Sequence, residues 1–218
     1  MSAGLAGADV RGAPPGSGDL AVIVLHGRDQ DPAWMYDHVV DGLAARLSGP
    51  AVTWVAPAAP GRAWYAGRVH DPLPDTRAER DAAADVVDGL AADLAAAGHA
   101  ADSVVLAGFS QGACLVADHL LRRPRRWAGA LIWTGAAFGP AGTPWPAVGE
   151  RPLTGVPVLA TNGDDDPWVP LSATDELVAT LRAHGADVTT RVEPGRAHEV
   201  ADGEIDRAAE LLRRAAPG

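Results

Sequence analysis

Largely apolar runs recur along the chain and predict a buried sheet. The first, residues 20–25, contains only Leu, Ala, Val and Ile. Further runs occupy residues 51–55, 103–107, 128–134, 156–161 and 187–192. Continuous apolar runs are typical of strands that helices cover on both faces, as in parallel sheets. The pattern therefore predicts a sheet that is mainly parallel.

Helical patterns lie between these runs. Apolar residues spaced every three or four positions predict helices at residues 33–47, 75–97, 111–122, 172–184 and 203–214. In the longest of them, Thr76 and Glu79 have the spacing of a capping box, and Gly98 is expected to end the helix.

Strands that alternate with helices indicate the α/β class, with helices on both faces of the sheet. We expect a flexible leader over residues 1–18, which are rich in Gly, Ala and Pro, and one domain over residues 19–218. The two longest connections, 56–74 and 135–155, are too short for a separate cap domain. The prediction is a single-domain α/β fold without a cap.

Composition narrows the classes of function. The formal net charge of −10 argues against a nucleic-acid partner, because phosphate binding needs clustered cations. All 18 basic residues are Arg, so Schiff-base chemistry on a lysine is excluded. Cys114 is the only cysteine, which excludes an intrachain disulfide.

The N-terminal segment and the lengths of the apolar windows indicate the cellular compartment. The leader lacks the positive start and apolar stretch of a secretory signal, and no apolar window is long enough to span a membrane. We expect a soluble, cytoplasmic protein. The sequence leaves its oligomeric state open, a homodimer included.

A serine motif stands between a predicted strand and a predicted helix. Gly108-Phe109-Ser110-Gln111-Gly112 has the Gly-x-Ser-x-Gly pattern in the context that this pattern requires. The glycines allow strand and helix to approach closely, and the helix N-terminus directs N–H groups at a developing oxyanion. Ser110 is therefore the predicted nucleophile.

A nucleophilic serine needs a base and an acid that orients the base. In a sheet of this kind the chain order is Ser, then Asp or Glu, then His. His198 follows the last predicted strand and is the predicted general base. The acid should come from the turn after residues 156–161; we favour Asp166, because Pro167 restrains the chain beside it, and Asp164 is the rival.

The other histidines are given simpler explanations. Surface positions account for His38, His70, His99 and His119. His26 could be a metal ligand together with Asp29 and Asp31, but the triad explains the site without a metal, so we expect neither metal nor other cofactor.

An oxyanion hole is predicted from the backbone N–H groups of Arg28, on the loop after the first strand, and of Gln111.

At these residues the sequence resembles the phospholipase/carboxylesterase family, the lidless α/β-hydrolases that include acyl-protein thioesterases. The likeness covers residues 20–214 and rests on four segments, 25–27, 108–113, 166–170 and 195–198, with a fifth at 62–65. It implies an α/β-hydrolase fold, Ser110, Asp166 and His198 as the triad, and Arg28 with Gln111 as the oxyanion hole.

Asp29 and Cys114 bear on how closely the sequence follows this resemblance. Asp29 stands where the family usually has Gly, and a positive φ there would be tolerated by Asp at some cost. Cys114 invites comparison with dienelactone hydrolases, which use a cysteine nucleophile, but it lies one helical turn beyond Ser110 and is expected in the core.

The expected activity is hydrolysis of carboxylic esters with small to medium acyl chains, through an acyl-enzyme. The same triad would serve a thioesterase or a lysophospholipase, and a non-catalytic binding relative is the competing class. Four aromatic residues on loops at the expected site edge could line an acyl pocket: Trp64, Tyr65, Trp145 and Trp168.

Overall fold

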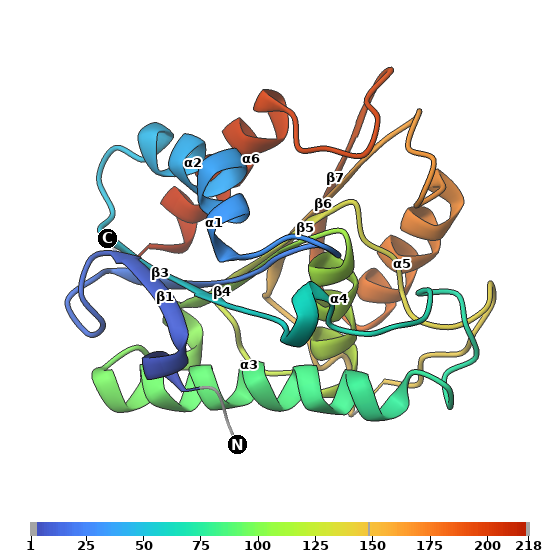
Figure 1. Cartoon of the computed structure of the whole chain (residues 1–218), viewed down its shortest axis with the longest axis horizontal. Helices are drawn as coiled ribbons and strands as arrows, with labels where there is room; N and C mark the ends of the chain where they lie inside the picture. Colours follow the sequence, from blue (N-terminus) through green and yellow to red (C-terminus); the bar gives the residue numbers. More distant parts are fainter. Residues whose placement is uncertain (1–3, 148, 217–218) are drawn as a thin grey trace.

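The computed structural model describes residues 4–147 and 149–216. Seven strands form one sheet in the order β1-β3-β2-β4-β5-β6-β7, in which β1 runs antiparallel to β3 and all other neighbours are parallel (Figure 1). The strands are β1 (Ala8–Gly12), β2 (Leu20–Leu25), β3 (Val52–Pro57), β4 (Val104–Phe109), β5 (Gly129–Trp133), β6 (Pro157–Gly163) and β7 (Asp187–Glu193). The predicted α/β-hydrolase fold, with a mainly parallel sheet, is confirmed.

Helices cover both faces of the sheet (Figure 1). One face packs against α3 (Arg77–Ala97), α4 (Gln111–Arg122) and α5 (Leu171–Ala183), and the other against α1 (Pro32–Met35), α2 (Asp41–Arg46) and α6 (Asp202–Ala215). A π-helical turn, Tyr36–Val40, joins α1 to α2, and short 3-10 turns lie at Leu5–Gly7, Pro60–Arg62 and Ala101–Ser103. Among the described residues, no helix is both long and apolar enough to cross a membrane.

The apolar run of β2 shows how burial on both faces shapes a strand. Ile23 and Leu25 pack into the core below α3 and α4, whereas Val22 and Val24 pack into the core below α1 and α6. Because successive side chains of a strand point to opposite faces, a strand covered on both faces is apolar at nearly every position. All six residues of β2 are buried.

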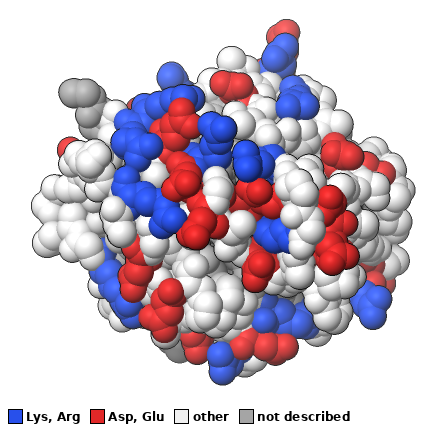
Figure 2. All heavy atoms as spheres, turned by 90° about the horizontal axis from the view of Figure 1, so that it is seen from above, with Lys and Arg blue, Asp and Glu red and all other residues white. Residues whose placement is uncertain are grey.

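The face formed by α2 and α6 carries charges of both signs. Arg46 of α2 lies 2.6 Å from carboxylate oxygens of Asp202 and of Asp206 on α6. Figure 2 shows acidic and basic side chains interspersed on the face that is seen from above. Exposed pairs of this kind add little stability, and this mixture differs from the clustered cations of a phosphate-binding surface.

The segment predicted as a leader contains a strand that sequence analysis did not assign. Residues of β1 pair with β3 from Ala8 opposite Pro57 to Gly12 opposite Thr53, and the Tyr36 hydroxyl donates to the carbonyl of Asp9 at 2.9 Å. The strand is short and only half-buried, so its sequence carries too few apolar residues to be recognised.

The predicted capping box at α3 is wrong. Thr76 is the N-cap residue, but its side chain caps no N–H group, and its hydroxyl lies 3.4 Å from the carbonyl of Leu73. The carboxylate of Glu79 instead accepts a hydrogen bond from the N–H of Ala66, at 3.1 Å, and so holds the loop before the helix. Gly98 does end the helix, with a φ of 115°.

Candidate active site

Ser110 stands alone between β4 and α4, on a sharp turn. Its φ of 53° and ψ of −116° are strained values for a residue with a side chain, and its N–H donates to the carbonyl of Trp133 at 3.0 Å. The turn lifts the hydroxyl away from the strand, while the next residue, Gln111, already starts the helix. This is the strand–turn–helix context predicted for the serine motif.

The two glycines of the motif are required by backbone contacts. A Cβ atom on Gly108 would lie 2.4 Å from the carbonyl carbon of Gly112. A Cβ atom on Gly112 would lie 2.1 Å from the carbonyl oxygen of Leu25, at the end of the neighbouring strand. Both distances are far below a van der Waals contact with rigid backbone, so α4 can pack this closely on β2 and β4 only without these side chains.

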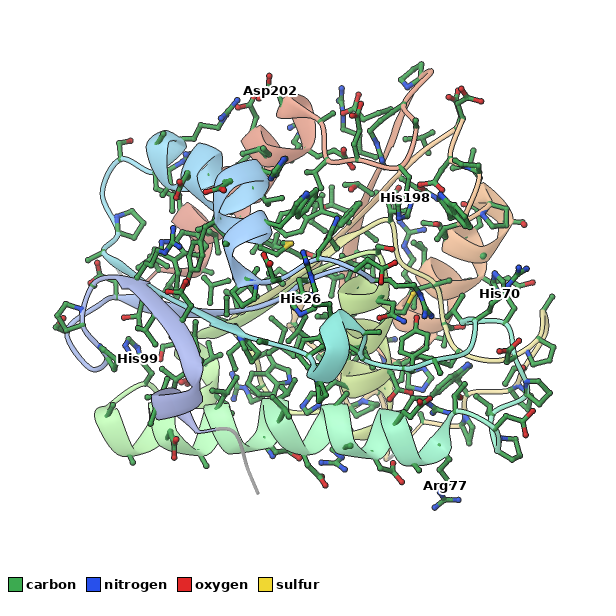
Figure 3. All side chains as sticks on the ribbon, viewed as in Figure 1. His26, His70, Arg77, His99, His198 and Asp202 are labelled. Atoms are coloured by element: carbon green, nitrogen blue, oxygen red, sulfur yellow. The ribbon has the colours of Figure 1, made fainter. Side chains whose placement is uncertain are left out.

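The imidazole of His198 lies beside Ser110, although 88 positions separate the two residues in sequence. It comes from the loop between β7 and α6 and lies at the carboxyl end of the sheet, away from His99 (Figure 3). Its Nε2 is 2.8 Å from the Ser110 Oγ, and its side chain is 20% exposed. The ring also packs on Phe109, with 5.0 Å between centroids.

Asp166 lies on the far side of the imidazole. Its Oδ2 is 2.7 Å from Nδ1 of His198, and its side chain is fully buried. Its Oδ1 accepts the N–H groups of Trp168 and Val169, at 2.8 and 2.9 Å. These donors stabilise the ionised carboxylate, which in turn holds Nδ1 protonated and leaves the Nε2 lone pair for the Ser110 hydroxyl.

The rival carboxylate, Asp164, has a different partner. Its Oδ1 accepts the N–H of Gly195 at 2.5 Å, and so it ties the loop that carries His198 to the end of β6. In the structure it is therefore Asp166, and not Asp164, that meets the imidazole of His198.

The loop after β2 packs directly against the serine. A Cβ atom on Gly27 would lie 3.2 Å from Cβ of Ser110. Asp29 has a φ of 61°, and its N–H donates to the carbonyl of Arg62 at 2.8 Å. The position therefore requires the left-handed conformation that glycine adopts most easily, and Asp occupies it at some cost in free energy.

Two backbone N–H groups near Ser110 remain free to donate. Among the described residues, no acceptor is found for the N–H of Arg28 or of Gln111. The N–H of Gly27 is already bound to the Gln30 side chain, at 2.9 Å. The Arg28 side chain turns aside and donates to the carbonyl of Gly67 at 2.5 Å.

The Gln111 side chain has a role that sequence analysis missed. Its carbonyl oxygen accepts the N–H of Trp64 at 3.0 Å, and its amide donates to the carbonyl of Tyr65 at 2.7 Å. The Gln111 side chain is buried, so the Trp64 N–H and the Tyr65 carbonyl depend on it for their hydrogen bonds. A glutamine directly after the nucleophile was the available signal, since its amide offers a donor and an acceptor on two separate atoms.

The four aromatic residues predicted at the pocket differ in their surroundings. Trp64 and Tyr65 are buried, and the Trp64 indole N–H donates to the carbonyl of His26 at 2.9 Å. Trp145 lines a shallow depression together with His70, and Ser110 is not part of its lining. Only Trp168 of the four is exposed, at 70%.

An aromatic stack beside the triad was also missed. Trp34, at the start of the helix after the β2 loop, stacks on Phe109 with 5.4 Å between centroids, and Phe109 contacts the ring of His198. The signal lay in Asp31 and Pro32, since Asp before Pro is typical of a helix start and would have placed Trp34 at the strand ends.

Several histidines and the cysteine are buried for other reasons. His99 and His119 are 3% and 1% exposed, so their predicted surface positions are wrong. His26 uses both ring nitrogens, with Nδ1–H donating to the Gly27 carbonyl at 2.7 Å and Nε2 accepting the Ala59 N–H at 3.0 Å, and burial lowers its pKa. Burial raises the pKa of the Cys114 thiol to about 11, which suits a core residue.

A cavity of about 310 Å³ lies elsewhere, against the amino-terminal ends of β6 and β7 and against α6. Pro157, Asp187 and Leu211 are among its lining residues, and neither Ser110 nor His198 is. Ser110 and His198 thus lie outside this cavity. Across the described ranges, no group of three or more His, Cys, Asp or Glu side chains is arranged to hold a metal ion.

The chain is similar to a known protein family and to several solved structures. The family model for phospholipase/carboxylesterase matches residues 16–215. A phospholipase/carboxylesterase from Dyadobacter fermentans is similar in structure, with 29% identity, a TM-score of 0.84, and coverage of 94% of this chain and 95% of that one.

Two further solved structures are similar. Esterase PE8 has 26% identity, a TM-score of 0.78, and coverage of 95% and 98% of the two chains. A carboxylesterase from Bacillus cereus has 18% identity, a TM-score of 0.70, and coverage of 95% and 94%, which shows the fold alone. Among curated proteins, none matches the chain.

Proposed function

The chain belongs to the phospholipase/carboxylesterase family and is a hydrolase of the esterase type, and on this premise we propose that it is a serine esterase with Ser110 as nucleophile, His198 as general base and Asp166 as the orienting acid. The observation that carries the proposal is one continuous line of hydrogen bonds. It joins Ser110 Oγ to His198 Nε2 at 2.8 Å, and His198 Nδ1 to Asp166 Oδ2 at 2.7 Å. Nucleophile, base and acid within hydrogen-bond reach are the arrangement that acyl transfer requires.

The reaction proceeds in two acyl-transfer steps. Nε2 of His198 accepts the Ser110 proton as Oγ attacks the carbonyl carbon of the ester. The N–H groups of Gln111 and Arg28 donate to the resulting oxyanion. The imidazolium then protonates the departing alcohol, which leaves Ser110 acylated, and water attacks the acyl-enzyme by the same route with His198 again as base. Asp166 keeps the imidazole in one tautomer and stabilises its charged form.

The substrates that fit are soluble esters with small to medium acyl chains. Supporting this, Trp168 stands exposed beside the turn that holds Asp166. Buried Trp64 and Tyr65 pack behind the serine and contribute to the wall rather than to a deep pocket. A thioester reacts through the same acyl-enzyme, so thioesters belong in the same assay.

The test is hydrolysis of p-nitrophenyl esters of graded acyl length by the wild type, Ser110→Ala and the control Ser103→Ala. Ser103 lies at the other end of β4, and its hydroxyl makes only a turn hydrogen bond to Ala100. We expect Ser110→Ala to lose about 10⁴-fold or more in kcat and Ser103→Ala to lose none. A fluorophosphonate should label Ser110 in the wild type.

Equal hydrolysis by wild type and Ser110→Ala would overturn the proposal. The acyl-length profile measures the size of the acyl site, and a parallel series of acyl thioesters compares the two leaving groups. A folded wild type that neither hydrolyses any of these compounds nor reacts with the fluorophosphonate would instead indicate a non-catalytic relative.

A further inference from the structure

A buried arginine holds the loop on which His198 stands. Arg196 precedes His198 by two positions and is 5% exposed. We propose that Arg196 is the positioning residue for His198, because its guanidinium joins the backbone on both sides of the imidazole to β5 and α6. The inference rests on the role of His198 as general base proposed above.

The guanidinium donates to the carbonyls of the two residues on either side of the histidine. Its Nη1 lies 2.8 Å from the carbonyl oxygen of Ala197 and also donates to the carbonyl of Glu199. These two residues flank His198 directly, so one nitrogen binds the peptide unit between Ala197 and His198 and the peptide unit that follows Glu199. Its Nη2 donates to the Thr134 hydroxyl at 2.9 Å, just beyond the end of β5.

A buried carboxylate completes the arrangement. Glu204, in the first turn of α6, is fully buried, and its Oε2 forms an ion pair with Nε of Arg196 at 3.1 Å. The same carboxylate accepts the N–H of Ala201 at 2.7 Å and the hydroxyl of Thr161 on β6. Burying two charges is costly, so the pair has to be held by further hydrogen bonds, as it is here.

The backbone of the loop also fits tightly on β6. A Cβ atom on Gly163 would lie 2.0 Å from the carbonyl oxygen of Arg196, so this strand end requires glycine. The next residue, Asp164, binds the N–H of Gly195. The loop that carries His198 therefore rests on the same strand end from which the turn with Asp166 begins.

One short segment after β5 serves both the serine and the histidine. The carbonyl of Trp133 accepts the Ser110 N–H at 3.0 Å, and the next residue, Thr134, accepts Arg196 through its hydroxyl. The N–H of Thr134 donates to the carbonyl of Thr161. The hydroxyl of Thr161 in turn donates to the carboxylate of Glu204. Arg196 thus fixes the position and orientation of the imidazole relative to Ser110 Oγ. The loop continues to Asp202 at the start of α6 (Figure 3).

A planar guanidinium is needed for these contacts. Lys keeps the charge but offers a single nitrogen, which cannot serve the two carbonyls, the Thr134 hydroxyl and Glu204 at once. We therefore expect Arg196→Lys to fold and to lose about 10- to 100-fold in kcat, with KM changed by less than about 3-fold, since a misplacement near 1 Å costs that much in rate.

A second pair of variants avoids the buried charge. Thr134→Val keeps the branched shape but removes the acceptor for Nη2, whereas Thr134→Ser keeps the hydroxyl. We expect a fall in kcat for Thr134→Val that is smaller than for Arg196→Lys, and near wild-type kcat for Thr134→Ser. If Arg196→Lys does not fold, the comparison of Thr134→Val with Thr134→Ser tests the positioning role of Arg196.

Arg80→Lys is the matched control. Arg80 is 4% exposed and paired with buried Asp118 between α3 and α4, away from the loop of His198. We expect this variant to lower the urea midpoint while kcat stays within about 2-fold, because it costs stability without moving the imidazole.

The low-field proton resonance of the hydrogen bond between His198 and Asp166 supplies a readout that needs no turnover. It should be sharp in the wild type and in Ser110→Ala, and broadened or lost in Arg196→Lys. A wild-type resonance and kcat in folded Arg196→Lys, or equal losses of kcat in Arg80→Lys, or equal kcat in Thr134→Val and Thr134→Ser, would overturn the positioning role. Hydrolysis that persists in Ser110→Ala would overturn the proposed function, and leaves the resonance to test the placement of His198 separately.

Discussion

The acidic turn after β6 shows how neighbouring residues of one type separate into different tasks. Asp166 contacts Nδ1 of His198 and accepts two N–H groups of its own turn, whereas Asp164 holds Gly195. Chain order admitted both carboxylates, and Pro167 only favoured one. The difference lies in which carboxylate faces the imidazole, and this is settled by the path of the loop from β7.

This difference predicts unequal kinetic effects of two matched substitutions. Asp166→Asn should lower kcat by roughly 10⁴-fold, because a neutral amide no longer selects the tautomer or stabilises the imidazolium. Asp164→Asn keeps an oxygen that can accept the Gly195 N–H, so its loss should stay below about 10-fold. Steady-state kinetics on the best p-nitrophenyl ester measures both. Equal losses of kcat in the two variants would contradict the orienting role proposed for Asp166.

Gly112 is constrained by a contact rather than by its backbone angles. The Cβ of an alanine there would lie 2.1 Å from the Leu25 carbonyl oxygen and 2.5 Å from the carbonyl carbon, and neither atom can move without shifting β2. We expect Gly112→Ala to lower the free energy of unfolding by about 3 kcal/mol or more, or to prevent folding.

Gly42 supplies the matched control for this substitution. It lies inside α2, where the nearest atom to an added Cβ is the flexible end of Arg46 at 3.4 Å. Gly42→Ala should raise the free energy of unfolding by about 0.5–1 kcal/mol, because alanine restricts the unfolded chain and favours the helix. Urea denaturation of both variants tests the pair, and a Gly112→Ala protein as stable as the wild type would contradict the contact.

At the scale of elements, α4 is the most deeply buried helix. Eleven of its residues, from Gln111 to Leu121, are buried, and Asp118 and His119 are among them. His119 is one of them, and its two ring nitrogens have no hydrogen-bond partner among the described residues. Sequence analysis placed His119 on the surface, because a single amphipathic pattern does not reveal that α3 covers the remaining face of α4.

Burial lowers the pKa of His119 from its ordinary 6.5 to about 4, although Asp88, 3.7 Å away, acts in the opposite sense. Three arginines also face the ring and favour its neutral form: Arg122, Arg123 and Arg125. Below pH 6.5 the unfolded chain therefore binds a proton that the folded chain does not accept until about pH 4. The stability that the neutral ring provides is present above pH 6.5 and is lost as the pH falls toward 4.

His119→Leu should remove this part of the pH dependence. Between pH 7.5 and pH 4.5 the wild type should lose up to about 3 kcal/mol more than the variant. Burial also lowers the pKa values of His26 and His99 and raises that of Glu204, but these groups are common to both proteins and cancel in the difference. Urea midpoints at the two pH values measure it. Parallel losses in the two proteins would show that His119 is protonated in the folded state.

At the scale of the whole molecule, the described residues form one sheet with a core on each face. Leu90 of α3 belongs to the core on one face, and Leu212 of α6 belongs to the core on the other; both are fully buried. Every central strand contributes side chains to both cores, so neither can come apart without exposing the sheet. The two cores should therefore unfold together.

Leu90→Ala and Leu212→Ala test this cooperativity. Each should lower the free energy of unfolding by about 2–5 kcal/mol, and the double variant should show the sum to within about 0.5 kcal/mol, because the two sites lie on opposite faces. Tryptophan fluorescence and far-ultraviolet circular dichroism should report one midpoint in urea for each protein. Separate midpoints for the two probes would mean that one layer of helices unfolds on its own.

The sequence by itself predicted most of the elements and the residues that meet at the candidate site. Largely apolar runs predicted six of the seven described strands, because a strand buried on both faces is apolar at most positions; β7 is the exception, since most of its residues are polar and exposed. Helix ends fell within a residue or two of the observed ones. Ser110 could be predicted because its motif is local: strand, turn and helix all lie within a few positions of the serine. His198 followed from chain order and the position of its loop.

Only the tertiary structure decided what depends on contacts between distant segments. The strand β1 exists because it pairs with β3, and too few of its own residues are apolar to predict it. The Gln111 side chain is important because the loop at Trp64 reaches it, and Arg196 because Thr134 and Glu204 converge on it. Such roles arise from hydrogen bonds between residues far apart in the chain, whose formation depends on distances that residue spacing in one sequence does not encode.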